Sequence, residues 1–187
     1  MHWRDHSNFR GQHASILSAS KHHWLNYTDD KFDRLVNALS EAQRGTEEHA
    51  FAAEAIRLKH KLEDNGTTLS MYVNDSIGHR MKPELPLVYS ANAFGTPDAI
   101  GFRKNKLRVN DLKTGQALTS MRQLRCYDAL FCLEYGMSPF KIEIENRIYQ
   151  NDDIKIDIPD PDDIMHIMQQ YKARSRRIDE LREEMEE

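Results

Sequence analysis

Two short apolar runs on either side of a polar turn constrain the fold of this chain more than any other stretch. Residues 99–102 and 107–112 have the composition of paired strands, and the four residues between them are polar. A two-residue turn at Lys104-Asn105 would fix the register, because asparagine tolerates the positive φ that such turns need. The predicted facing pairs are Phe102 with Leu107, Ile100 with Val109, and Asp98 with Asp111.

The same register brings charged groups to one end of the hairpin. Side chains alternate along a strand, so Asp98, Asp111 and Lys113 share a face with the apolar residues. Opposed like charges repel, and an unpaired buried charge costs about 3–5 kcal/mol. A divalent cation between the two aspartates would offset that cost, and Mg²⁺ suits a site made of a few carboxylates and water. The alternative is a surface hairpin in which Lys113 only forms an ion pair with Asp111.

The order of these residues resembles the signature of the PD-(D/E)XK nucleases. Pro97-Asp98 is followed, after twelve residues, by Asp111-Leu112-Lys113. The surrounding Gly-Thr-Pro-Asp and Asp-Leu-Lys-Thr-Gly are similar to the RecB-like, phage-type exonuclease branch of that superfamily. The resemblance extends over about residues 18–149. It implies an α/β fold in which a central mixed sheet is flanked by helices in a restriction-endonuclease-like core, followed by a C-terminal helix.

The resemblance assigns a role to each residue of the predicted site. Asp98, Asp111 and Lys113 would be catalytic, with Lys113 positioning the attacking water. Asp98 and Asp111 would bind one or two Mg²⁺ or Mn²⁺ ions together with His49 and the backbone carbonyl of Leu112. Imidazole is a better ligand for Mn²⁺ than for Mg²⁺. A histidine in the metal set therefore indicates that manganese would serve well.

His49 and Glu84 enter the predicted site by position in the motifs. Residues 44–49, Arg-Gly-Thr-Glu-Glu-His, resemble the Gly-Thr-x-x-His of this branch. Taken alone, His49 would be an ordinary histidine on the flank of an apolar helix stripe. Glu84 lies between Pro83 and Pro86 and is expected to be either an accessory acid or a common edge-strand glutamate.

Substrate contacts are predicted from two further motifs. Ser18-Ala-Ser20, a few residues before Trp24, resembles the Ser-x-Ser opening of phage-type members. Gln123 and Tyr127 resemble the Gln-x-x-x-Tyr motif that follows the catalytic strands. Their spacing of four places both on one helix face, from which an amide and a phenol could contact DNA.

Apolar periodicity predicts the remaining elements. Helices are expected over residues 29–43, 47–62, 69–81, 118–135 and from 164 onward, and strands over 85–89, 141–149 and 154–158. Gly45 is expected to separate the first two helices, and Gly136 to end the fourth. Residues 1–187 are predicted to form a single nuclease domain, with a core over about 18–158 and the last helix over 159–187.

Composition indicates in which cellular compartment such a domain would be found and which kinds of DNA-binding protein it could be. No apolar run approaches the ~20 residues that cross a membrane, and the N-terminus is too polar for a signal peptide. Cys126 and Cys132 suit neither a disulfide nor a zinc site, so a cytoplasmic protein is expected, in the bacterial host if it is phage-encoded. The net charge of −4 argues against a DNA-coating protein but not against a nuclease with clustered basic residues. Such clusters occur at residues 21–23, 103–108, 122–125 and 172–177, and each is either a solvated face or a phosphate contact.

The predicted function is hydrolysis of DNA phosphodiester bonds by a free-standing, metal-dependent exonuclease. Only two cysteines are present, so the iron–sulfur members of the branch are excluded, and no helicase motif accompanies the nuclease motifs. Two alternatives stay open: a nuclease-derived module that binds DNA or protein without cutting, and an endonuclease. Because related phage enzymes assemble as rings with a single-strand-annealing protein, the resemblance implies DNA, a homo-oligomer and such a partner, acting in recombination.

Overall fold

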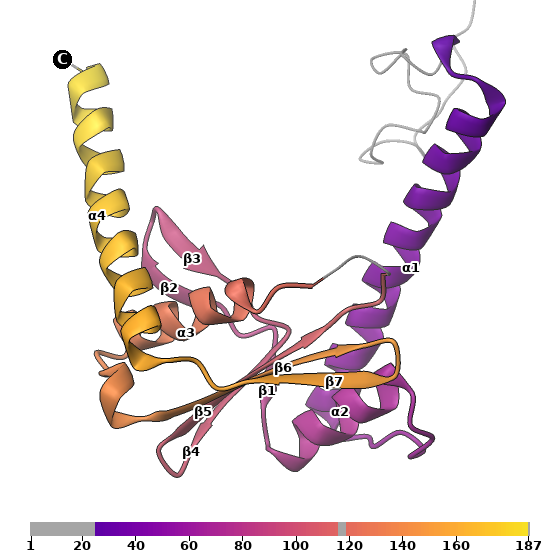
Figure 1. The fold of residues 1–187 in the computed structure, drawn as a ribbon, viewed down its shortest axis with the longest axis horizontal. Helices are drawn as coiled ribbons and strands as arrows, with labels where there is room; N and C mark the ends of the chain where they lie inside the picture. The colour runs from indigo at the N-terminus through magenta and orange to yellow at the C-terminus, as the bar shows by residue number, and fades with distance from the viewer. Residues whose placement is uncertain (1–24, 116–118, 187) are drawn as a thin grey trace, which may run out of the picture. The chain divides into compact units, whose positions relative to one another are not determined.

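The computed structural model describes residues 25–115 and 119–186 (Figure 1). The chain divides into two compact units, residues 1–44 and 45–187, and each is described by itself. In the first unit the described part is mainly the beginning of helix α1 (Asp29–Leu58), whose first turn carries Asp29 and Asp30. Carboxylates at this position stabilise a helix N-terminus, as the sequence predicts.

A five-stranded sheet forms the centre of the second unit, in the order β1-β4-β5-β6-β7. Strands β5 and β6 are parallel, and the other neighbours are antiparallel. These strands are β1 (Lys82–Pro83), β4 (Ala99–Arg103), β5 (Lys106–Leu112), β6 (Glu143–Gln150) and β7 (Asp153–Asp157). A separate two-stranded sheet pairs β2 (Leu87–Ser90) with β3 (Ala93–Gly95). The mixed sheet with its helices confirms the predicted α/β class.

The predicted hairpin is confirmed as β4 and β5. Phe102 pairs with Leu107 and Ile100 with Val109, while Lys104 and Asn105 have φ values of 49° and 60°. Two consecutive positive values are those of a type I′ turn, whose twist matches that of the flanking strands. The third expected pair is not part of the ladder, because β4 begins at Ala99 and Asp98 lies in the loop before it.

Helices cover both faces of the sheet, as Figure 1 shows for α2 and α3. The helices are α2 (Thr68–Gly78), α3 (Arg122–Glu134) and α4 (Pro161–Glu186), together with the part of α1 after Gly45. Leu107 and Val109 of β5 belong to the core shared with α3 and α4, whereas Leu112 belongs to the core shared with α1 and α2. Within the described residues, no helix is both long and apolar enough to span a membrane, and Cys126 and Cys132 are free thiols.

Two predicted element boundaries are wrong at the start of the domain. Helix α1 continues through Gly45, because one glycine costs a helix only about 1 kcal/mol. A Cβ atom at Gly45 would lie 2.7 Å from Oγ1 of Thr114, so this glycine serves a close approach rather than a break. The strand expected over residues 85–89 belongs to the small sheet as β2, and the five-stranded sheet begins instead at the short β1.

The other differences concern the ends of elements and the last strand. Helix α2 ends at Gly78, α3 begins at Arg122, and α4 begins at Pro161, where Oδ1 of Asp160 accepts a hydrogen bond from the N–H of Asp162. The expected half-buried strand over 154–158 is β7, at the edge of the sheet. Ile156 and Ile158 are 58% and 66% exposed, so alternation there does not indicate a buried face.

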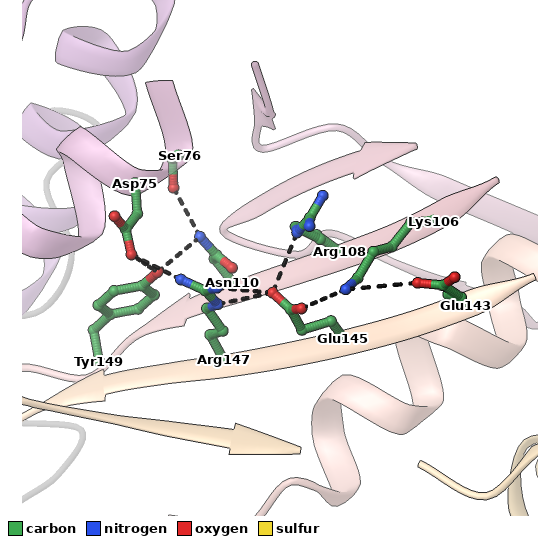
Figure 2. Close-up of polar contacts among 9 residues, drawn as sticks. All are labelled: Asp75, Ser76, Lys106, Arg108, Asn110, Glu143, Glu145, Arg147 and Tyr149. Atoms are coloured by element: carbon green, nitrogen blue, oxygen red, sulfur yellow. Dashed lines mark hydrogen bonds and ion pairs between the residues drawn. The ribbon is translucent and has the colours of Figure 1, made fainter. Parts of the chain in front are cut away.

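A network of charged residues joins α2 to β5 and β6 (Figure 2). Glu145 of β6 is only 8% exposed and contacts three cations. Its carboxylate lies 2.6 Å from Lys106 Nζ, 3.2 Å from Arg108 Nε and 2.9 Å from an Arg147 nitrogen. Arg147 also contacts Asp75 of α2 at 2.9 Å, which connects the helix to the sheet.

Glu145→Gln is expected to lower the free energy of unfolding at pH 7 by about 3 kcal/mol, because three cations lose their common anion. Burial alone would raise the pKa of Glu145 from 4.5, but Lys106, Arg147 and Arg108 lower it to about 2. A depressed pKa contributes stability above about 4.5 that is lost as the pH falls toward 2. Urea unfolding should therefore show a smaller difference between variant and wild type at about pH 3.

Glu143→Gln provides the matched control, because Glu143 is an exposed glutamate 3.7 Å from Lys106. An exposed ion pair of this kind contributes about 0–1 kcal/mol. If both glutamine variants cost the same free energy, burial of the Glu145 charge is not what makes the network important.

Candidate active site at the end of β5

Asp111 and Lys113 meet where β5 ends. Asp111 is 3% exposed, and Lys113 Nζ lies 3.0 Å from its Oδ1 and 2.9 Å from its Oδ2. Only the contact with Oδ1 has the geometry of a hydrogen bond, so the buried Oδ2 has no hydrogen-bond partner among the described residues. The backbone N–H of Lys113 donates to the carbonyl of Tyr149 on β6 at 2.9 Å. The lysine is therefore anchored by the sheet rather than by the loop that follows.

Asp98 reaches the same end of the sheet from the loop before β4. Its Oδ2 accepts a hydrogen bond of 2.9 Å from the backbone N–H of Leu112. Its Oδ1 lies 3.4 Å from Nδ1 of His49, which α1 supplies. The carboxylate is thus held between a helix and the last residue of β5, which brings His49 and Asp98 together as predicted.

The electrostatics of these residues tie them into one site. Burial and the charge of Asp98 together raise the pKa of Asp111 to about 6, against the opposing effect of Lys113. The bond to Asp98 raises the pKa of His49 above its ordinary 6.5 against the effect of burial, and the charges of Asp98 and Asp111 add to the rise. Two carboxylates that act on each other make this end of the sheet attractive to a cation.

Gln123 and Tyr127 extend the site along α3. Oε1 of Gln123 accepts a hydrogen bond of 3.4 Å from Lys113 Nζ, and its Nε2 donates to the Tyr127 hydroxyl at 3.2 Å. The prediction that both residues share a helix face is confirmed. Sequence reasoning missed what allows the tyrosine to sit here: a Cβ at Gly95 would lie 3.0 Å from the Tyr127 ring. The glycine at the start of the Gly-Thr-Pro-Asp motif was the available signal.

The structure does not show the predicted contacts of Glu84, of the Leu112 carbonyl, or of Ser18 and Ser20. The Glu84 carboxylate forms an ion pair with Arg57 of α1, and only the Glu84 backbone reaches Asp98, through an N–H that donates to the Asp98 carbonyl at 3.0 Å. For Leu112 the structure shows the N–H in use, and the metal-binding role of its carbonyl stays a prediction. Ser18 and Ser20 lie outside the described residues.

A metal ion fits the donors here by chemistry, although they do not form a complete cage. Among the described residues, no group of three His, Cys, Asp or Glu side chains is arranged to hold a metal. Mg²⁺ commonly binds through one or two carboxylates and keeps several waters, so three protein donors are not required. Oδ2 of Asp111 is a buried acceptor that has the Lys113 ammonium 2.9 Å away but no hydrogen bond among the described residues, and a metal ion could bind it.

Comparison of the chain with protein-family models, with curated proteins and with solved structures found no match. What this site does must therefore be inferred from its own residues and contacts.

Proposed function

We propose that this protein is a divalent-metal-dependent deoxyribonuclease of the PD-(D/E)XK type, most similar to the free-standing RecB-like and phage exonucleases. The observation that supports it best is the joint position of Asp98, Asp111 and Lys113 at one end of β5. Asp111 is buried beside Lys113, and Asp98 is held against the strand end by Leu112 and His49. Two acids and an amine in this arrangement are what hydrolysis of a phosphodiester with metal assistance requires.

Asp98 and Asp111, with His49 and the Leu112 carbonyl, would hold one or two Mg²⁺ or Mn²⁺ ions. The bound metal would lower the pKa of water and offset charge on the phosphate oxygens. Lys113 would orient the attacking water and stabilise the same charge. If a metal ion replaced the Lys113 ammonium beside Asp111, Lys113 would still have a hydrogen-bond acceptor in Oε1 of Gln123, which is 3.4 Å from its Nζ.

DNA is the proposed substrate, and Gln123, Tyr127, Ser18 and Ser20 are its proposed contacts. We place the reaction in the cytoplasm, in the bacterial host if the protein is phage-encoded, as part of recombination. A homo-oligomer and a single-strand-annealing partner stay predictions. Met185, at the end of α4, is 77% exposed and belongs to the surface on which such a contact should be sought.

Digestion of end-labelled single- and double-stranded DNA tests this function. With Mg²⁺ or Mn²⁺ present, the wild-type protein is expected to remove nucleotides from one or both ends of the labelled strands. EDTA should stop the reaction. Discrete fragments from closed circular DNA would instead indicate the endonuclease alternative. A well-folded protein that cuts none of these substrates with either metal would contradict the proposal and favour the non-cutting module.

A further inference from the structure

Three hollows adjoin one another around Arg80, and the second of them lies at the end of β5 opposite the candidate active site. Their volumes are about 790, 470 and 270 Å³, and Arg80 lines all three. Lys106, which lines the second hollow, begins β5, whereas Asp111 lies five residues along the same strand. At about 3.3 Å per residue, the two Cα atoms are roughly 17 Å apart. The second hollow is therefore separate from the carboxylates, whereas the first extends along β1 to Glu84, whose N–H donates to the Asp98 carbonyl.

Exposed cations without an ion-pair partner among the described residues surround these hollows, and we call them the basic patch. They are Lys59, Arg80, Lys82, Arg103 and Lys104. Lys106 and Arg108 line the same region, but Figure 2 shows both committed to Glu145. The network thus neutralises the cations beneath the surface and leaves those of the patch available to an anionic ligand.

The smallest hollow has an aromatic floor beside the patch. The rings of Phe102 and Phe131 are 5.3 Å apart, and those of Phe131 and Tyr135 are 4.8 Å apart, with interplanar angles of 40° and 37°. Phe131 is buried, whereas Tyr135, at the end of this row, is 50% exposed. Its ring is accessible to another flat ring, and Arg80, Lys82 and Arg103 line the same hollow.

The position of Arg80 is not one that folding alone would favour. The N–H of Met81 donates to the carbonyl of Ser76, and the N–H of Arg80 donates to that of Ile77, which together form a Schellman motif at the end of α2. Arg80 occupies the left-handed position of this motif with φ 56°. Helix α3 has Gly136 at its equivalent position, φ 62°, which is the usual choice.

We propose that the basic patch binds single-stranded nucleic acid, with a base stacked on Tyr135 and backbone phosphates on Arg80, Arg103 and Lys104. Cations that follow the phosphates and an aromatic ring that stacks on a base are the two requirements of such surfaces. A duplex stacks its bases on one another and offers no free base to Tyr135. The proposal goes beyond the nuclease function, because it uses none of the residues placed in the active site.

Fluorescence anisotropy with a labelled thymidine oligonucleotide of about 15 nucleotides, in EDTA so that nothing is cut, tests this surface. The double variant Arg80→Asn with Arg103→Ala is expected to bind at least tenfold more weakly. The slope of log K against the logarithm of the salt concentration should become less steep by about 1.4, because the variant removes two phosphate contacts and each contributes about 0.7. Asparagine tolerates positive φ, so loss of binding would not come from loss of the fold.

Tyr135→Ala is expected to weaken binding about tenfold with an unchanged salt slope, because it removes stacking and no charge. Arg182→Ala, at an exposed arginine of α4 outside the basic clusters, is the matched control and should bind as wild type does. Unchanged affinity in the double variant, or equal affinity for duplex DNA or polyglutamate of the same charge, would overturn the proposal. So would displacement of the oligonucleotide by an equal concentration of thymidine monophosphate.

The binding and cleavage tests fail independently. Loss of binding only in Lys113→Ala would locate the oligonucleotide at the active site and overturn the second surface. Absence of cleavage in the presence of metal contradicts the nuclease function and leaves the binding result as it stands.

Discussion

Lys113→Ala is expected to lower the rate of metal-dependent DNA hydrolysis by about 10²–10³-fold, the usual effect of removing one group that stabilises a transition state. The variant loses the ammonium that lies 2.9 Å from Asp111 and that would orient water and offset charge on the phosphate. Initial rates on end-labelled DNA at saturating Mg²⁺ or Mn²⁺ measure the effect. Arg182→Ala, outside the basic clusters, should cleave at the wild-type rate.

Stability must be measured beside activity, because Lys113 also neutralises a buried acid. Without the lysine, the pKa of Asp111 should rise further above its value of about 6. The variant should therefore lose more stability at about pH 8, where Asp111 is charged, than at about pH 5. A variant that shows this loss of stability yet cuts DNA at the wild-type rate would reduce Lys113 to an ion-pair partner of Asp111.

Asp128→Asn is expected to stabilise the protein by on the order of 3 kcal/mol at pH 8. Asp128 of α3 has no exposed surface, and burial raises the pKa of its carboxyl to about 8 although Asn146 donates a hydrogen bond of 2.6 Å to it. Oδ1 of Asp128 and Oδ1 of Asn146 both lack a hydrogen-bond partner among the described residues. An amide at position 128 can donate as well as accept, and it never becomes charged.

The pH dependence gives this prediction its sign. Between the ordinary pKa of 3.8 and the folded value of about 8, the folded state holds a proton that the unfolded state releases. The free energy of unfolding of the wild type therefore falls as the pH rises through this window, and asparagine removes that fall. Thermal or urea unfolding at about pH 4, 6 and 8 should show a gain for the variant that grows with pH. Asp64→Asn, at an exposed aspartate, is the control and should show no such trend.

The hairpin could be predicted closely because its determinants are local. Alternating apolar residues and two turn residues that accept positive φ specify β4 and β5 without reference to the rest of the chain. The same register places Asp111 and Lys113 on one face, and their contact follows. The spacing of Gln123 and Tyr127 is equally local, since residues four apart on a helix are neighbours.

The errors come from contacts between segments distant in sequence. Gly45 looks like a helix break until Thr114, which packs against it, is considered. The sequence leaves Glu84 open between an accessory acid and a common edge-strand glutamate, and it does not show that the carboxylate pairs with Arg57, twenty-seven residues earlier. Ile156 alternates as a half-buried strand residue does, yet β7 lies at the edge of the sheet. No periodicity in a single segment reports which other segment will cover it.

The parallel pairing of β5 and β6 has a consequence for how this protein can change. Two adjacent parallel strands need a crossover, and α3, which lies between them in the chain, provides it. The inner side of α3 fills the core with Leu124 and Leu130, whereas Gln123 is exposed and Tyr127 is partly buried beside Gly95. Deleting the helix would separate the two strands, but replacing its exposed residues would leave the architecture whole. Evolution could thus change which polymer the protein binds by substituting exposed residues of α3 without destabilising the fold.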